Sequence, residues 1–171
     1  MVRNWDPERD GKCPNCQQTE NSYHLNLCDN RDRTRLLYRM VNNFAKWLSS
    51  NYAHPDIAYW IPKYIKLQGI RKLRDFPMLP IAMRHIAASQ DLVPWTCFME
   101  GKISWEILLI QESVLASSPS PLSIAYWTKH FITHLLQISH AQWVFRNVSL
   151  HNHTIGYVHE VKRQKVLQEI D

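Results

Sequence analysis

Several features are scarce or absent in this sequence, and each absence excludes a class of protein. Only four glycines occur among 171 residues, and the P-loop, G-x-G-x-x-G and G-x-S-x-G motifs are missing, so neither nucleotide-binding loops nor the nucleophile turn of hydrolases is expected. No run of about eighteen apolar residues occurs, so we expect no membrane span. Residues 1–6 contain no apolar stretch typical of a signal peptide, so we expect an intracellular protein, nuclear or cytoplasmic.

Carboxylates are too few and too scattered to suggest metal-dependent catalysis. The chain has 15 Asp and Glu, and none of them forms a cluster that could hold the paired magnesium ions of a polymerase or RNase H. An H-E-x-x-H motif is also missing. His151-Asn152-His153 spells HNH, but no ββα-metal unit surrounds it. We therefore expect no enzyme; a metal-dependent nuclease using His130, His134, His151 or His153 is the catalytic alternative.

Apolar and aromatic residues, in contrast, are abundant enough to form a core. Hydrophobic residues make up 45% of the chain, with seven Trp, seven Tyr and five Phe, which argues against disorder over most of its length. Nine prolines lie mainly between periodic segments and mark breaks between them. The length predicts one domain with an appended mini-domain.

The most specific motif is a cluster of cysteine and histidine near the start of the chain. Cys13, Cys16, His24 and Cys28 follow the pattern C-x2-C-x7-H-x3-C. Pro14 favours a tight turn that directs two sulfurs at one ion, and His24 and Cys28 share a face on a helical turn. These four ligands fill every position of tetrahedral Zn²⁺ and leave none for water, so we expect a structural zinc ion that contributes folding free energy.

The cysteines and histidines allow other pairings. Four cysteines could form two disulfides, but a C-x2-C pair beside a histidine favours zinc in a reducing compartment. Cys97 lies far from the other three, and we expect it to be a small buried hydrophobe. His130 and His134 are four residues apart, but they lack a third ligand at a fixed spacing, so a second metal site there has weak support.

Positive charge is concentrated directly after the metal motif. Residues 31–74 carry ten Lys and Arg against two Asp and Glu, a balance of +8 in a chain whose net charge is +5. Aromatic residues are interleaved with these cations, a combination that suits a nucleic-acid backbone and unstacked bases. A solvated helix face with its aromatics in the core would have the same composition. The predicted nucleic-acid-binding residues are Arg31, Arg35, Arg39, Lys63, Lys66, Arg71, Lys72 and Arg74.

Apolar periodicity predicts a mainly α protein with a zinc knuckle at 1–30 and a helical domain at 31–171. We expect about five to six helices in an orthogonal or bundle-like arrangement, with Asp29 or Asn30 capping the first and Pro62 kinking or splitting the second. A small hairpin is expected at the C-x2-C turn. The predicted helices cover about 32–49, 56–68, 81–92, 104–116, 122–151 and 156–170, and the core residues predicted around the fourth helix are Trp95, Phe98, Ile103 and Trp105.

Three parts of the sequence resemble retroelement proteins. The opening, CPNCQQTENSYHLNLC, resembles the zinc-binding segment that follows the polymerase and RNase H regions of some retroelement proteins. Residues 90–111 and the stretch HAQWVFRNVSLHNHTIGYV resemble C-terminal regions of retrotransposon-derived reading frames in diatoms and fungi. The resemblance implies a reverse-transcriptase tail without its catalytic domain. The residues it implies are the zinc ligands Cys13, Cys16, His24 and Cys28, and signature residues without a defined role, Trp143, Arg146, Asn147 and His151.

The four signature residues fall on roughly one face of the predicted long helix. We expect a polar seam in which Arg146 and Asn147 satisfy backbone groups and His151 packs. Taken together, the sequence predicts a non-catalytic, zinc-stabilised helical module that binds nucleic acid, RNA or DNA. The alternative is a protein-interaction or oligomerisation domain with a structural zinc clip, in which an apolar helix face docks a partner or a second copy.

Overall fold

The computed structural model describes residues 11–21 and 24–154. This part of the chain contains seven α-helices, and its β structure is one isolated antiparallel bridge between Lys12 and Thr19. The predicted mainly α class is confirmed, and the predicted helix at 156–170 lies outside the described residues. The elements are α1 (His24–Leu27), α2 (Arg31–Ser50), α3 (Pro55–Lys66), the 3-10 turn η1 (Leu73–Asp75), α4 (Ile81–Gln90), α5 (Trp95–Met99), α6 (Trp105–Ser117) and α7 (Ile124–Thr154).

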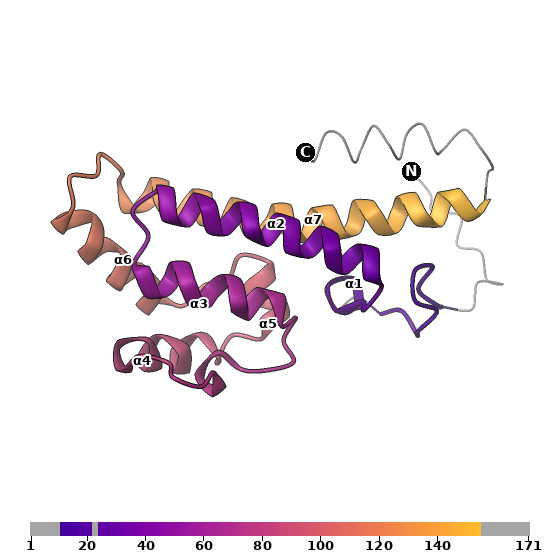
Figure 1. Cartoon of the computed structure of the whole chain (residues 1–171), viewed down its shortest axis with the longest axis horizontal. Helices are drawn as coiled ribbons and strands as arrows, with labels where there is room; N and C mark the ends of the chain where they lie inside the picture. The colour runs from indigo at the N-terminus through magenta and orange to yellow at the C-terminus, as the bar shows by residue number, and fades with distance from the viewer. Residues whose placement is uncertain (1–10, 22–23, 155–171) are drawn as a thin grey trace.

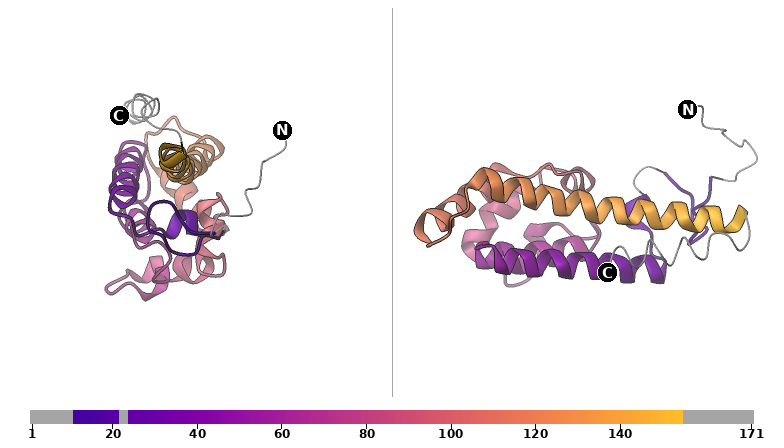
Figure 2. Two further views of the ribbon diagram at one scale, coloured as in Figure 1. Left: turned by 90° about the vertical axis from the view of Figure 1, so that its right-hand side faces the viewer. Right: turned by 90° about the horizontal axis from the view of Figure 1, so that it is seen from above.

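The two longest helices, α2 and α7, lie side by side and run in opposite directions (Figures 1 and 2). Apolar side chains of α2 recur at helical spacing, and Val41, Phe44 and Leu48 are fully buried. The ring of Phe44 meets the ring of Phe131 on α7 edge to face, with centroids 5.1 Å apart. α3 packs against α2, and α4, α5 and α6 complete the other side of the core.

The ends of the first helices follow the predicted capping rules. The side-chain oxygen of Asn30 accepts hydrogen bonds from the backbone N–H groups of Asp32 and Arg33, at 3.0 and 3.2 Å, so the predicted cap is confirmed. Pro62 does not split α3, which continues from Pro55 to Lys66. The buried neighbours of Pro62 hold the helix together, because tertiary packing outweighs the lost backbone hydrogen bond.

The short helix α5 was not among the predicted elements. Pro94 follows the turn after α4 and stands at the N-cap of this new helix. Trp95, Phe98 and Met99 are buried, at the i, i+3 and i+4 spacing of a helix face. After α5 the chain turns at Gly101, where φ is +89° and a Cβ would lie 2.7 Å from Cγ2 of Ile132 on α7. Glycine is therefore required at this close approach.

The prediction that Trp105 belongs to the core is wrong. Its side chain is 65% exposed in the first turn of α6. The buried face of that helix is formed by Ile107, Gln111 and Leu115, which are separated by four residues each, and Trp105 lies on the opposite side. Ser104 precedes α6 as predicted, but its hydroxyl makes no capping hydrogen bond. Within the described residues, no helix combines the length and apolarity needed to cross a membrane.

Candidate metal centre

The four predicted ligands converge at one point. One ligand atom from each of Cys13, Cys16, His24 and Cys28 lies within 4.8 Å of all the others. The sulfurs of Cys13 and Cys28 are 3.8 Å apart, and the sulfur of Cys16 is 3.2 Å from Nε2 of His24. Ligand atoms around a tetrahedral zinc ion are separated by about 3.5–3.8 Å. The group can therefore hold a metal ion. None of the four cysteines is in a disulfide, so the two-disulfide alternative is wrong.

Local backbone structure brings these ligands together. The backbone N–H of Gln17 donates to the carbonyl of Cys13, and the N–H of Cys13 donates to the carbonyl of Gln18, both at 2.8 Å. Gln17 has φ +63°, which closes the turn around the C-x2-C pair. His24 begins α1, where its N–H donates to Oδ1 of Asn21 at 2.9 Å. Cys28 follows one helical turn later, so it shares a face with His24 as predicted.

Cys13, His24 and Cys28 are buried and Cys16 is half buried, and the surroundings shift the pKa values of two of the thiols. Burial raises the pKa of the Cys28 thiol to about 12, because a thiolate without a counter-ion is poorly solvated there. The pKa of Cys13 is affected by the same burial, but it lies below its ordinary value because backbone N–H groups of Asn15 and Cys16 stabilise the thiolate. A bound dication would supply the charge that stabilises both thiolates. Three sulfurs and one imidazole nitrogen form a donor set suited to zinc and leave no position for water.

An ion pair joins the metal-binding segment, residues 11–21 and 24–28, to the last helix, α7. Glu20 accepts hydrogen bonds from Nε of Arg146 at 2.8 Å and from Nη2 of the same side chain. These bonds hold the pKa of Glu20 below its usual range. Nη1 of Arg146 also donates to Oδ1 of Asn147 at 3.1 Å. The seam residues thus bind a carboxylate of the metal-binding segment and each other, rather than the backbone groups we expected.

The other two seam residues have separate surroundings. The ring of Trp143 is half exposed and stacks on His140, with centroids 5.7 Å apart. The side chain of His151 lies outside the described part of the chain, although its backbone belongs to α7. The predicted packing of His151 stays a prediction.

Arg33 is a central residue of this region that the sequence analysis missed. It is completely buried, and its Nε donates to Oε1 of Gln142 on α7 at 3.1 Å. Its Nη2 donates to the carbonyl oxygen of Leu25 in α1. We counted Arg33 with the basic residues around it, yet its helical phase matches that of the buried Leu37 and Val41. That phase is the signal that could have found it.

Five of the eight predicted nucleic-acid-binding residues lie on two adjacent helices. Nζ of Lys66 on α3 donates to Oδ1 of Asn42 on α2 at 2.8 Å, which joins the two helices at their surface. Nζ of Lys63 lies 3.5 Å from the ring centre of Tyr59. We define the basic face as these two lysines with the three exposed arginines of α2: Arg31, Arg35, Arg39, Lys63 and Lys66.

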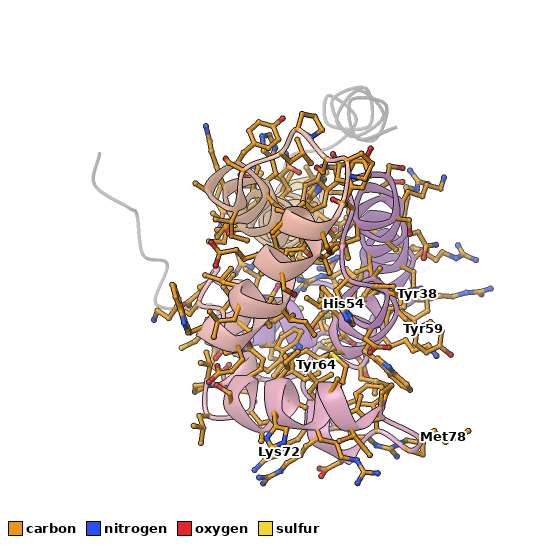
Figure 3. All side chains as sticks on the ribbon, turned by 90° about the vertical axis from the view of Figure 1, so that its left-hand side faces the viewer. Tyr38, His54, Tyr59, Tyr64, Lys72 and Met78 are labelled. Carbon is orange, nitrogen blue, oxygen red and sulfur yellow. The ribbon has the colours of Figure 1, made fainter. Side chains whose placement is uncertain are left out.

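The remaining three cations follow α3 and lie elsewhere. Lys72 is at the lower edge of the molecule in Figure 3, whereas Tyr38 and Tyr59 are at the right. Nε of Arg74 lies 4.0 Å from the carboxylate of Asp91. That carboxylate also accepts a hydrogen bond from the backbone N–H of Arg74 at 2.9 Å, so the side chain is drawn to a local partner. Arg71 and Lys72 are exposed.

The aromatic residues among the cations divide into exposed rings and buried rings. Tyr38, Tyr52 and Tyr59 are exposed, whereas Trp60 and Tyr64 are part of the core. The core interpretation therefore holds for some of these rings and the surface interpretation for others.

Cys97 is half buried rather than fully buried.

His130 and His134 belong to an aromatic cluster between α2 and α7. The ring of His134 stacks on Phe44, with centroids 5.3 Å apart, and lies tilted against Trp47, with centroids 4.9 Å apart. Burial and the neighbouring His130 hold the pKa of His134 below its ordinary value. In the described part of the chain, only the Cys3His group brings three or more histidine, cysteine or acidic side chains together in a way that could hold a metal ion.

Comparisons with protein-family models, with curated proteins and with solved structures found no match for this chain. The described part of the chain is thus a helical domain with an N-terminal Cys3His group that could hold a metal ion.

Proposed function

We propose that this chain is a non-catalytic, zinc-stabilised module that binds nucleic acid through its basic face. The observation that carries the proposal is the convergence of Cys13, Cys16, His24 and Cys28 beside the start of α2. A closed set of three thiolates and one imidazole suits zinc in a structural role. In that role the ion fixes the metal-binding segment against the helices from which the cations project.

The basic face has the properties of a phosphate-binding surface. Arg31, Arg35 and Arg39 are exposed and recur one helical turn apart, so charges repeat about every 6 Å along α2. Lys63 and Lys66 extend the charge onto α3. The exposed rings of Tyr38 and Tyr59 lie among these cations and could stack with unpaired bases, which favours a single strand as the ligand.

A salt titration tests this mechanism. If all five cations of the basic face contact phosphates, the affinity for a labelled single-stranded oligonucleotide should fall about a hundredfold between 50 and 200 mM salt. A double variant, Arg35→Glu with Lys63→Glu, should weaken binding strongly and reduce the salt dependence. The matched control, Arg71→Glu with Lys72→Glu, changes the charge equally but elsewhere, and it should bind nearly as well as the wild type. An affinity that does not depend on salt would refute the proposal.

A protein-interaction domain is the second candidate, and exposed apolar side chains favour it. Met78, Ile81 and Leu92 are largely exposed around α4, and Trp105 is exposed on α6. Isolated apolar side chains are normal on a surface, but several large ones can form part of a docking site. Size-exclusion chromatography and pull-down without nucleic acid would detect such a partner or a second copy. In that case Arg35→Glu with Arg39→Glu should leave the association intact.

A further inference from the structure

Arg33 carries a buried positive charge that no carboxylate neutralises within the described residues. Its side chain is fully buried, and its hydrogen-bond partners in the described part of the chain are all neutral: the side chain and carbonyl of Gln142 and the carbonyl of Leu25. Nη1 is buried and has no hydrogen-bond partner among residues 11–21 and 24–154. A guanidinium stays charged in proteins. A buried charge without a counter-charge is strongly destabilising, so this side chain calls for a negative group nearby.

The carboxylate of Glu20 does not supply that negative charge. Glu20 is close enough for Arg33 to lower its pKa, but both of its oxygens are already bound by Arg146. Arg33 and Arg146 carry two positive charges and Glu20 carries one negative charge, so one positive charge is not neutralised. The excess lies beside the ligands, because Arg33 binds the carbonyl of Leu25, the residue after His24 in the turn that leads to Cys28.

The metal centre supplies the missing charge. Three thiolates and a neutral imidazole around a dication carry one net negative charge. Arg33 is placed to act on this site, because its Nη2 donates to the carbonyl oxygen of Leu25, in the turn between His24 and Cys28. With the centre filled, the charges of the centre, Glu20, Arg33 and Arg146 add to zero.

We propose that Arg33 is the counter-ion of the metal–thiolate centre, a positioning residue that sets the affinity of the site for zinc. The proposal rests on the proposed zinc ion but not on nucleic-acid binding. Groups outside the ligand shell commonly change metal affinity by about 10- to 100-fold. Here the effect is specific to a centre with three thiolates: a site with two thiolates and two imidazoles is neutral and has no charge for Arg33 to balance.

The test compares Arg33→Gln with Arg33→Lys in the full chain by competition with a chromophoric zinc chelator. Both replacements are shorter than arginine and lose its planar fork, so they disturb packing alike and differ in charge. Arg33→Gln should bind zinc about 10- to 100-fold more weakly than wild type. Arg33→Lys should stay within about fivefold of wild type, since the charge remains. Equal losses in the two variants would overturn the proposal.

A ligand exchange provides the second arm. Cys16→His makes the centre neutral while it keeps four ligands. In that background Arg33→Gln should change zinc affinity by less than about threefold, because no net charge is left to balance. The same large loss in both backgrounds would show that Arg33 acts through packing and would overturn the proposal. A wild-type chain that binds no zinc would overturn the metal centre itself, whereas one zinc per chain with equal Lys and Gln losses would overturn only the role of Arg33.

Discussion

At the scale of single residues, Cys28 and Cys97 are chemically alike but differ in their surroundings. Cys28 is buried among the other ligands, whereas Cys97 is half buried and receives a weak hydrogen bond from Nζ of Lys102 at 3.8 Å. The motif spacing predicted this difference in role. The burial of Arg33 was not predicted, because Arg33 entered only the charge count of residues 31–74. A charge count does not show which way a side chain points.

Cys28→Ser should remove most zinc binding. The serine hydroxyl is a poor ligand for zinc, so the affinity should fall by more than about a hundredfold, beyond the usual effect of groups outside the ligand shell. Elemental analysis of the purified protein would show zinc per chain falling toward zero. Cys97→Ser is the matched control, and it should keep one zinc per chain. Full zinc in Cys28→Ser would remove Cys28 from the ligand set.

The Glu20–Arg146 pair should make stability depend on pH in acid. The pKa of Glu20 is lowered in the folded chain by Arg146, so the pair contributes stability above the unfolded pKa of about 4.3. That contribution is lost as pH falls through the lower folded pKa. At neutral pH, Glu20→Gln should therefore lower the free energy of unfolding by about 1.5–3 kcal/mol.

Chemical denaturation at several pH values would measure this difference. The difference in the free energy of unfolding between wild type and Glu20→Gln should become smaller as pH falls below about 4.3. Glu112→Gln, at an exposed site on α6, should differ little from wild type at any pH. A gap that stays constant into strong acid would contradict the role of the ion pair.

At the scale of elements, the long periodic helices could be predicted and the short one could not. Five buried apolar residues mark one face of α2, so the bounds predicted from the sequence agree with those of the helix to within about a residue. α5 has five residues, too few for a periodic signal. Only Pro94 and the spacing of Trp95, Phe98 and Met99 hint at it, and the same residues fit a loop.

The cap of α2 offers a test at this scale. Besides its bonds to two backbone N–H groups of α2, Asn30 donates through Nδ2 to the carbonyl of Asn15 at 2.9 Å, so it also holds the C-x2-C turn. Asn30→Ala should destabilise the chain by about 1–2 kcal/mol, measured by denaturant unfolding. Ser104→Ala is the comparison, since Ser104 precedes α6 without a side-chain capping bond and should cost less. Equal costs would mean that the cap of α2 contributes nothing special.

At the scale of the whole molecule, the metal-binding segment is docked along the later part of α7 (Figures 1 and 2). Glu20 and Arg146 are 126 residues apart, and Arg33 and Gln142 are 109 apart. No local pattern in the sequence reveals contacts over such separations. The ligand set, in contrast, lies within one short stretch and could be predicted from spacing alone.

Chelation should therefore act first at one end of the molecule. The helices share a large apolar core that contains none of the four ligands. Removing zinc should expose backbone amides of residues 11–21 and 24–28 to hydrogen exchange while those in the core of α2, α3 and α7 stay protected. Exchange measured by mass spectrometry, with and without chelator, would show this. Uniform loss of protection would mean that the metal supports the entire fold, and no loss anywhere would count against a structural ion.

X-ray absorption at the zinc edge tests the metal centre most directly. Zinc bound by Cys13, Cys16, His24 and Cys28 should show three sulfurs at about 2.3 Å and one nitrogen at about 2.0–2.1 Å, with one ion per chain. An ion surrounded mainly by oxygen, or a purified chain without zinc, would contradict the metal centre on which the proposed module is built.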